Sequence, residues 1–398
     1  MAIPVGAKAE KDQFYGRSRE LADLWGLFEL NHVVLSGPRR LGKTSLLQRL
    51  VDDASAKGWH AVLIDVQGHS RVEDMLGELE RSLPDTAIKR WLDSAKTQVG
   101  HAADRLRKVE LKLPGGFGAA LELQAPPAAA WAAQAQRLQA RLASQPVLIL
   151  IDEFSVFLEK LIAQDKPGAE MLLGWLRTWR CTSGVLCRFV FTGSIGLNTL
   201  LARHRLTTYF NDCYDFRLQA FTRPEAIAMV QAQLQREARA HAPEVAGYLC
   251  DRVGWLSPYY VNLLLLEALR AARDREAERN TPASALTTTD VDDGYDRLLA
   301  TRSRFVHWYQ RLERDLTATD LAVALKVLDS VSGKPDGSTQ RQLLARLNAL
   351  EPDPPTRLRR LDQALWHLAE DGYLDTDGDR IRFLSFLLRD YWQRNHGR

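Results

Sequence analysis

The stretch "LSGPRRLGKTSLLQRL" (residues 35–50) leaves an apolar segment through glycine, proline and two arginines, and then takes the pattern of an amphipathic helix. The order of Gly37, Gly42, Lys43 and Thr44 fits G-x-x-x-x-G-K-[ST], the phosphate-binding loop or P-loop. Glycines let backbone N–H groups turn toward phosphate oxygens, and the helix that follows adds the positive end of its dipole. The pattern predicts nucleotide binding, with Lys43 on the β- and γ-phosphates and the Thr44 hydroxyl on Mg²⁺.

A second motif lies downstream, where "VLILIDEF" (147–154) reads as a strand buried on both faces of a parallel sheet. It ends in Asp152 and Glu153. The first carboxylate is predicted to hold Mg²⁺, and the second to polarise the water that attacks the γ-phosphate. An acidic pair also arises where a strand simply ends at the surface, but the upstream P-loop favours the catalytic interpretation.

The next apolar segment, "CRFVFTGS" (187–194), ends in two hydroxyl side chains, Thr192 and Ser194. Either could contact the attacking water and the γ-phosphate, and either could instead be an ordinary residue of a turn. Both are kept as catalytic candidates, together with Glu153 and Lys43.

Composition limits the classes of protein that need to be considered. The 398 residues are 45% apolar and 26% charged, with a net charge of +3, as in ordinary globular proteins. That charge is too small to indicate nucleic-acid binding by itself. No apolar run is long enough for a membrane helix, and the N-terminus lacks the apolar region of a signal peptide. Four cysteines without a C-x-x-C pair are read as reduced, so a cytoplasmic protein is expected.

The order of elements predicts the fold class. Strand-like segments at 32–36, 60–67, 147–154 and 187–194 alternate with helical ones, which indicates an α/β fold with a doubly wound parallel sheet. Alternation around "PGGFG" predicts a hairpin at 109–123, and helices dominate after residue 222. The expected domains are 1–220, which bind nucleotide, 221–300, a helical lid, and 301–398, a linker helix with a further domain.

Several segments together resemble the AAA+-related P-loop ATPases of the STAND/archaeal-type ATPase group. In order they are "FYGRSREL", "GPRRLGKTSLL", "LILIDEF", "FVFTGSIGL", "RLQAFTRPEA" and "GWLSPYYVNLL", over roughly residues 14–270. The resemblance implies ATP and Mg²⁺ as ligands, a Gly-Arg element near adenine, and a lid proline near the nucleotide. The residues assigned to the nucleotide are Tyr15, Gly16, Arg17, Gly37, Pro38, Arg39, Arg40, Leu41, Gly42, Lys43, Thr44, Ser45 and Pro258, with Thr44 and Asp152 on Mg²⁺.

The chain departs from that group in two places. Many relatives carry an arginine before the segment that matches "FRLQAF", whereas this chain reads "TTYFNDCYDF", with Asp212 near the expected position. Two tyrosines follow the lid proline, where some relatives have a sensor arginine. Arg203, Arg205 and Arg217 are alternative arginine fingers or ordinary surface residues. ATP binding is therefore better supported than rapid hydrolysis.

The last hundred residues predict helices at 317–333, 338–347 and 354–374, then a hairpin around Asp377-Gly378 and a final helix. This order is that of a winged helix-turn-helix domain, which the resemblance also implies. Arginines at 357, 359, 360, 380 and 382 are placed to reach DNA. Interleaved acidic residues leave protein docking as the other interpretation.

Three functions are consistent with these patterns. The first is an ATPase that acts as a nucleotide-dependent switch and couples the state of ATP to the winged helix. The second is a DNA-acting AAA+-type motor or loader that works as a homo-oligomer. The third is a nucleotide-binding scaffold with negligible turnover.

Overall fold

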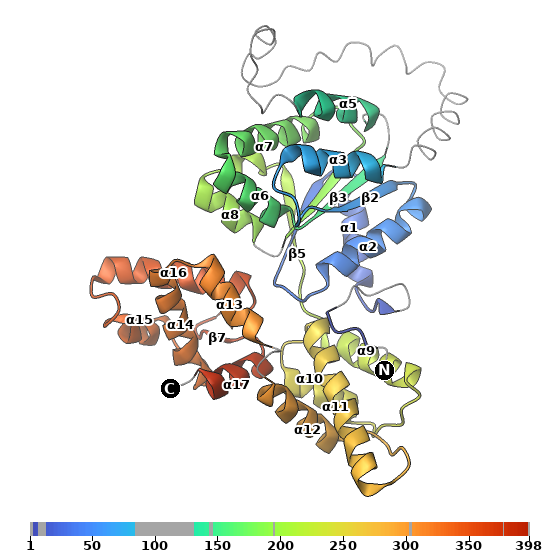
Figure 1. Cartoon of the computed structure of the whole chain (residues 1–398), viewed down its shortest axis with the longest axis vertical. Coiled ribbons are helices and arrows are strands. Elements are labelled where there is room, and N and C mark those ends of the chain that lie inside the picture. Colours follow the sequence, from blue (N-terminus) through green and yellow to red (C-terminus); the bar gives the residue numbers. More distant parts are fainter. Residues whose placement is uncertain are drawn as a thin grey trace. The chain divides into compact units, whose positions relative to one another are not determined.

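The computed structural model describes residues 3–6, 13–83, 131–142, 146–193, 196–301, 305–376 and 378–396 (Figure 1). Its contacts group the chain into two compact units. Unit 1 contains residues 1–17, 37–45 and 218–398, and unit 2 contains residues 18–36 and 46–217. The P-loop segment therefore belongs to the same unit as the C-terminal half of the chain. The domain limits expected near residues 220 and 300 remain predictions.

Unit 2 is built on a five-stranded parallel sheet with the order β2-β3-β4-β1-β5. All four strand pairings are parallel, and β4 lies between β1 and β3. The strands are β1 (His32–Ser36), β2 (His60–Asp65), β3 (Val147–Asp152), β4 (Arg188–Thr192) and β5 (Cys213–Arg217). The carboxyl ends of β1, β3 and β4 consequently share one edge of the sheet.

Helices cover both faces of this sheet, as the sequence predicts. Alternate side chains, such as Val34, Ile149 and Phe191, join one core with the helices after β2 and β3. Their neighbours Leu35 and Leu150 are equally buried, and because side chains alternate along a strand they point to the other face of the sheet. The helices are α1 (Ser18–Leu27), α2 (Lys43–Ala54), α3 (Val72–Ser82), α5 (Ala132–Leu142), α6 (Phe154–Gln164), α7 (Lys166–Arg180) and α8 (Leu197–His204), with short 3₁₀ turns at Ser55–Lys57 and Thr207–Tyr209.

The structure adds two elements that the sequence reading lacked. One helix was expected after β3, but Asp165 caps a second one, since its carboxylate accepts the N–H of Gly168. Strand β5 was not expected, because its side chains are at most half-buried at the edge of the sheet and carry no continuous apolar pattern. The hairpin predicted at 109–123 lies outside the described residues.

His32, at the start of β1, is buried and connects β4 to the end of α7 through hydrogen bonds of its ring. Its Nδ1 accepts the N–H of Phe189 at 3.1 Å, and its Nε2 lies 3.2 Å from the carbonyl oxygen of Arg180. This pattern requires the neutral ring, with Nε2 as the donor. Burial, reinforced by the charge of Arg180, lowers the pKa of His32 to about 4.

We expect this histidine to make the fold sensitive to acid. Because its pKa is lower in the folded than in the unfolded state, its contribution is complete above about pH 6.5 and is lost as pH falls toward 4. The loss amounts to about 3 kcal/mol at most. Urea unfolding at pH 7, 6 and 5 should show a smaller pH dependence in His32→Asn than in the wild type. The same substitution at the half-exposed His60 is the control, and equal slopes in all three proteins would refute the assignment.

Unit 1 contains the helices of the predicted lid, α9 to α12, which are called the lid helices below, and the C-terminal elements. A reciprocal capping box starts α9, in which Thr222 and Glu225 satisfy each other's N–H groups. The helices are α9 (Arg223–Arg236), α10 (Val245–Val253), α11 (Pro258–Arg279), α12 (Thr288–Ala300), α13 (Val306–Asp315), α14 (Ala318–Ser332), α15 (Gln340–Leu347), α16 (Pro354–Glu370) and α17 (Phe386–Asn395). An antiparallel pair, β6 (Leu374–Asp375) and β7 (Arg382–Phe383), lies between α16 and α17.

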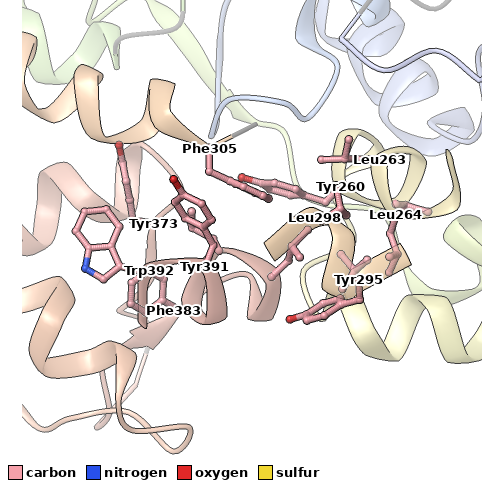
Figure 2. Close-up of a cluster of buried hydrophobic side chains, with 14 of the residues drawn as sticks. Tyr260, Leu263, Leu264, Tyr295, Leu298, Phe305, Tyr373, Phe383, Tyr391 and Trp392 are labelled. Carbon is pink, nitrogen blue, oxygen red and sulfur yellow. The ribbon is translucent and has the colours of Figure 1, made fainter. Parts of the chain in front are cut away.

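One hydrophobic core joins the lid helices to the C-terminal helices (Figure 2). Tyr260 of α11 stacks on Trp308 of α13 with ring centroids 6.3 Å apart, and Trp308 meets Tyr373 edge to face at 4.6 Å. The hydroxyl of Tyr295 in α12 donates to Asp390 in α17 at 2.8 Å. Lid and C-terminal helices are therefore packed as one body within unit 1.

No helix in the described part of the chain is both long and apolar enough to span a membrane.

Candidate nucleotide site

The P-loop has the backbone that its glycines predict. Gly37 and Gly42 have φ values of 127° and 86°, in the region that favours glycine. A Cβ on Gly37 would lie 2.7 Å from the carbonyl oxygen of Leu218, so a side chain there would force the backbone to move. Arg40 between them also has a positive φ, 69°. For a residue with a side chain this costs about 1–2 kcal/mol, which the surrounding contacts must offset.

Lys43 begins α2 and is buried. Its ammonium group donates to the carbonyl oxygens of Gly37 at 2.6 Å and Pro38 at 3.0 Å. Thr44 and Ser45 follow in the first turn of α2, both half-buried. The predicted phosphate ligands are therefore brought together at a helix N-terminus, where the dipole favours an anion.

The predicted Gly-Arg element reaches the same loop. Arg17 is buried, donates to the carbonyl oxygen of Leu41 at 3.2 Å, and lies over the ring of Phe221. Gly16 has a φ of 64°, and the Tyr15 hydroxyl accepts a hydrogen bond from Arg236 in α9. The element thus links the P-loop to the start of the lid.

Pro258 occupies the first turn of α11, as a proline at a helix start should. The residue before it, Ser257, was not among the predicted site residues. Its hydroxyl donates to the carbonyl oxygen of Arg40 at 2.7 Å. A serine directly before a helix-starting proline was the available signal, but it indicates a helix cap and not a partner 217 positions away.

The acidic pair lies where β3 ends. Asp152 is buried, and one of its carboxylate oxygens accepts the N–H of Glu153 at 3.0 Å. Glu153 has a φ of 57° and directly precedes α6. Such strain in a residue with a side chain is typical of functional sites, where it sets the direction of a reactive group.

Thr192 ends β4, which is paired with both β1 and β3. Its hydroxyl is buried and has no hydrogen-bond partner among the described residues. A buried hydroxyl of this kind costs free energy unless a ligand or water pairs with it. Ser194, its predicted competitor, lies outside the described residues.

The predicted arginine fingers have ordinary structural surroundings. Arg203 lies 3.7 Å from Glu159, Arg205 ends α8, and Arg217 ends β5 on an exposed edge. Asp212, which lies near the position where an arginine finger was sought, forms a bidentate pair with the buried Arg180. Asp212 therefore has a structural role in unit 2, where it neutralises the buried Arg180.

Oxygen ligands suit Mg²⁺, which binds carboxylates, hydroxyls, water and phosphates. The predicted ligands Thr44 and Asp152 fit this preference, and Lys43 at the N-terminus of α2 suits phosphate. The residues present therefore match Mg-ATP in chemistry.

A parallel five-stranded sheet with a P-loop sequence directly after β1 is the fold of P-loop nucleotide-binding domains. Among solved structures, the chain is similar to the Walker-type ATPase PABY2304 of Pyrococcus abyssi. The TM-score is 0.64 at 14% identity, covering 99% of this chain and 100% of that one. It is also similar to the ORC2 protein of Aeropyrum pernix, solved in ADPNP–ADP complexes. Here the TM-score is 0.54 at 13% identity, covering 96% and 94% of the two chains.

No protein-family model matches the chain, and no curated protein matches it.

Proposed function

We propose that this protein binds Mg-ATP, hydrolyses it, and uses the state of the nucleotide to control its C-terminal helices. The observation that carries the control step is a contact within unit 1 between the P-loop and the turn after α16. A Cβ on Gly372 would lie 2.8 Å from the Cβ of Pro38 and 3.4 Å from the Trp255 ring. Only a glycine allows this approach, so the turn packs directly on the loop that is to hold phosphate.

The proposed chemistry assigns one task to each part. Lys43 and the P-loop N–H groups would hold the phosphates, and Thr44 and Asp152 would hold Mg²⁺, which would supply charge neutralisation at the phosphates. Glu153 takes a proton from the attacking water, and the unpartnered hydroxyl of Thr192 orients that water or the γ-phosphate.

Buried charges hold the Gly372 turn in place. Asp371 accepts a hydrogen bond from Arg311 in α13 at 2.6 Å and lies 3.4 Å from Nε2 of His367. Burial raises the pKa of Asp371, and Arg39 of the P-loop is among the cations that oppose this rise. The hydroxyl of Tyr373 donates to the carbonyl oxygen of Trp308. A rearrangement of the P-loop would thus act on a firmly anchored turn.

We propose further that α14–α17 with the β6–β7 pair form a winged helix that docks on protein. Internal contacts of three of the five arginines predicted to reach DNA support docking. Arg357 donates to Asn348, Arg360 lies 3.3 Å from Glu351, and Arg382 pairs with Asp375. The carboxylates of Glu351 and Asp375 reduce the positive charge available to phosphates, and the neutral Asn348 orients Arg357.

The Gly372→Ala variant tests the switch. The added methyl group should separate the turn from Pro38, so we expect faster proteolysis of the C-terminal helices and a smaller difference between the ATP- and ADP-bound states. Gly58→Ala is the matched control, because Gly58 has a similarly positive φ of 78° and no atom of the described residues lies within 4 Å of its Cβ position. Identical cleavage of the wild type with ATP, ADP and no nucleotide would refute the switch.

The same preparations separate the alternatives. ATPase rates and sizing chromatography are measured with and without duplex DNA. Stimulation by DNA together with ATP-dependent oligomers would favour the motor or loader, and binding without turnover would favour the scaffold.

A further inference from the structure

Ser257 stands at the N-cap of α11 but does not cap the helix. Its φ and ψ of −62° and 131° are those of an N-cap, yet its side chain accepts no N–H from the first turn. The hydroxyl instead donates to the carbonyl oxygen of Arg40 in the P-loop, and Ser257 is completely buried. The Ser257 hydroxyl, which could have capped α11, is thus bonded to the P-loop.

Arg40 is held at its other end by the same helix. Its guanidinium carbon lies 4.2 Å from the centroid of the Tyr259 ring, a cation–π geometry. Ser257 therefore fixes the backbone of Arg40, and Tyr259, two positions later, fixes its side chain. The strained left-handed conformation of Arg40 persists only where such contacts over-determine it.

We infer that Ser257 and Tyr259 are positioning residues that hold the P-loop in its phosphate-binding shape. The inference rests on the proposed function and names two lid residues that set the affinity of that site. Without them, Arg40 relaxes to a commoner backbone conformation, and the N–H groups between Gly37 and Gly42 no longer converge on one phosphate. Neither side chain touches the reacting atoms, so KM should rise while kcat changes little.

Ser257→Ala removes the hydroxyl without uncapping α11. A hydrogen bond of this kind is worth about 0.5–1.5 kcal/mol, so the Kd for Mg-ATP should rise roughly 2- to 10-fold. Ser385→Ala is the matched control. Ser385 is also a completely buried N-cap in unit 1, but its hydroxyl does cap its helix, by accepting the N–H of Leu388. This control should lower the midpoint of urea unfolding and leave the Kd unchanged.

Tyr259 provides a second, independent test. Tyr259→Phe keeps the aromatic face and should bind Mg-ATP as the wild type does. Tyr259→Leu removes that face and should raise the Kd roughly 2- to 5-fold. The ratio between these two variants does not depend on whether Ser257→Ala folds.

Titration calorimetry with Mg-ATP on the full chain, beside steady-state kinetics, decides the matter. An unchanged Kd in Ser257→Ala, or equal affinities in the two Tyr259 variants, overturns the positioning role while the proposed function stands. A wild-type protein that binds no Mg-ATP overturns the proposed function, and this inference with it.

Discussion

Replacing Lys43 with alanine is expected to abolish the stabilisation of the protein by Mg-ATP. In the wild type, ATP at about 100 times its Kd should add roughly 2.7 kcal/mol to the free energy of unfolding. The lysine would supply a charge-assisted contact to the phosphates, and it donates hydrogen bonds to the carbonyl oxygens of Gly37 and Pro38 in the P-loop. Thermal melting with and without Mg-ATP measures the difference.

The control for this variant is Lys57→Ala, which removes an exposed lysine from the turn after α2. It should keep the full ATP-dependent shift, although it changes the net charge by the same amount. Equal shifts in Lys43→Ala and the wild type would mean that this segment is not a phosphate-binding loop.

The second large effect is expected from Glu153→Gln. Glutamine keeps the size of the side chain and the left-handed backbone at this position, but it cannot accept a proton. ATP should remain bound while turnover falls by about 10²- to 10⁴-fold, the usual loss for a general base. Single-turnover hydrolysis measures the chemical step, and calorimetry confirms that binding persists.

Glu159→Gln on the exposed side of α6 is the matched control, since Glu159 is partly exposed and lies beside Arg203. Hydrolysis by Glu153→Gln within a factor of two of the wild type would make Glu153 a structural residue at a strand end. In that case the strain at its backbone would have another cause.

Local sequence patterns were sufficient to predict the backbone of the P-loop and the end of β3, while the roles assigned to their residues remain predictions. The P-loop has a fixed spacing, and its glycines adopt the positive φ values that the spacing predicts. The acidic pair follows an apolar strand, and the structure ends β3 at Asp152. Such features depend on residues close together in the chain, so their conformational preferences can be read directly.

Local sequence patterns do not predict elements whose structure depends on residues far away in the chain. Strand β5 has a mixed, largely exposed pattern, and only its pairing with β1 makes it a strand. Likewise, Asp212 lies near the position where an arginine was expected, but in the structure it pairs with Arg180. No local pattern predicts this pairing, because the two residues are far apart in the sequence.

The sequence by itself determined the backbone of the P-loop, and it predicts a phosphate ligand, because the spacing of a short run of residues is the signature of phosphate binding. Only the tertiary structure decided what holds that loop: Ser257 and Tyr259 on Arg40, and Gly372 on Pro38. These contacts join residues more than two hundred positions apart. They form only because burial of the shared core offsets the entropic cost of closing such long loops. In the sequence, a serine before a proline looks the same whether it caps a helix or bonds to the P-loop. A glycine after a helix likewise looks the same whether it only ends that helix or also packs on the P-loop.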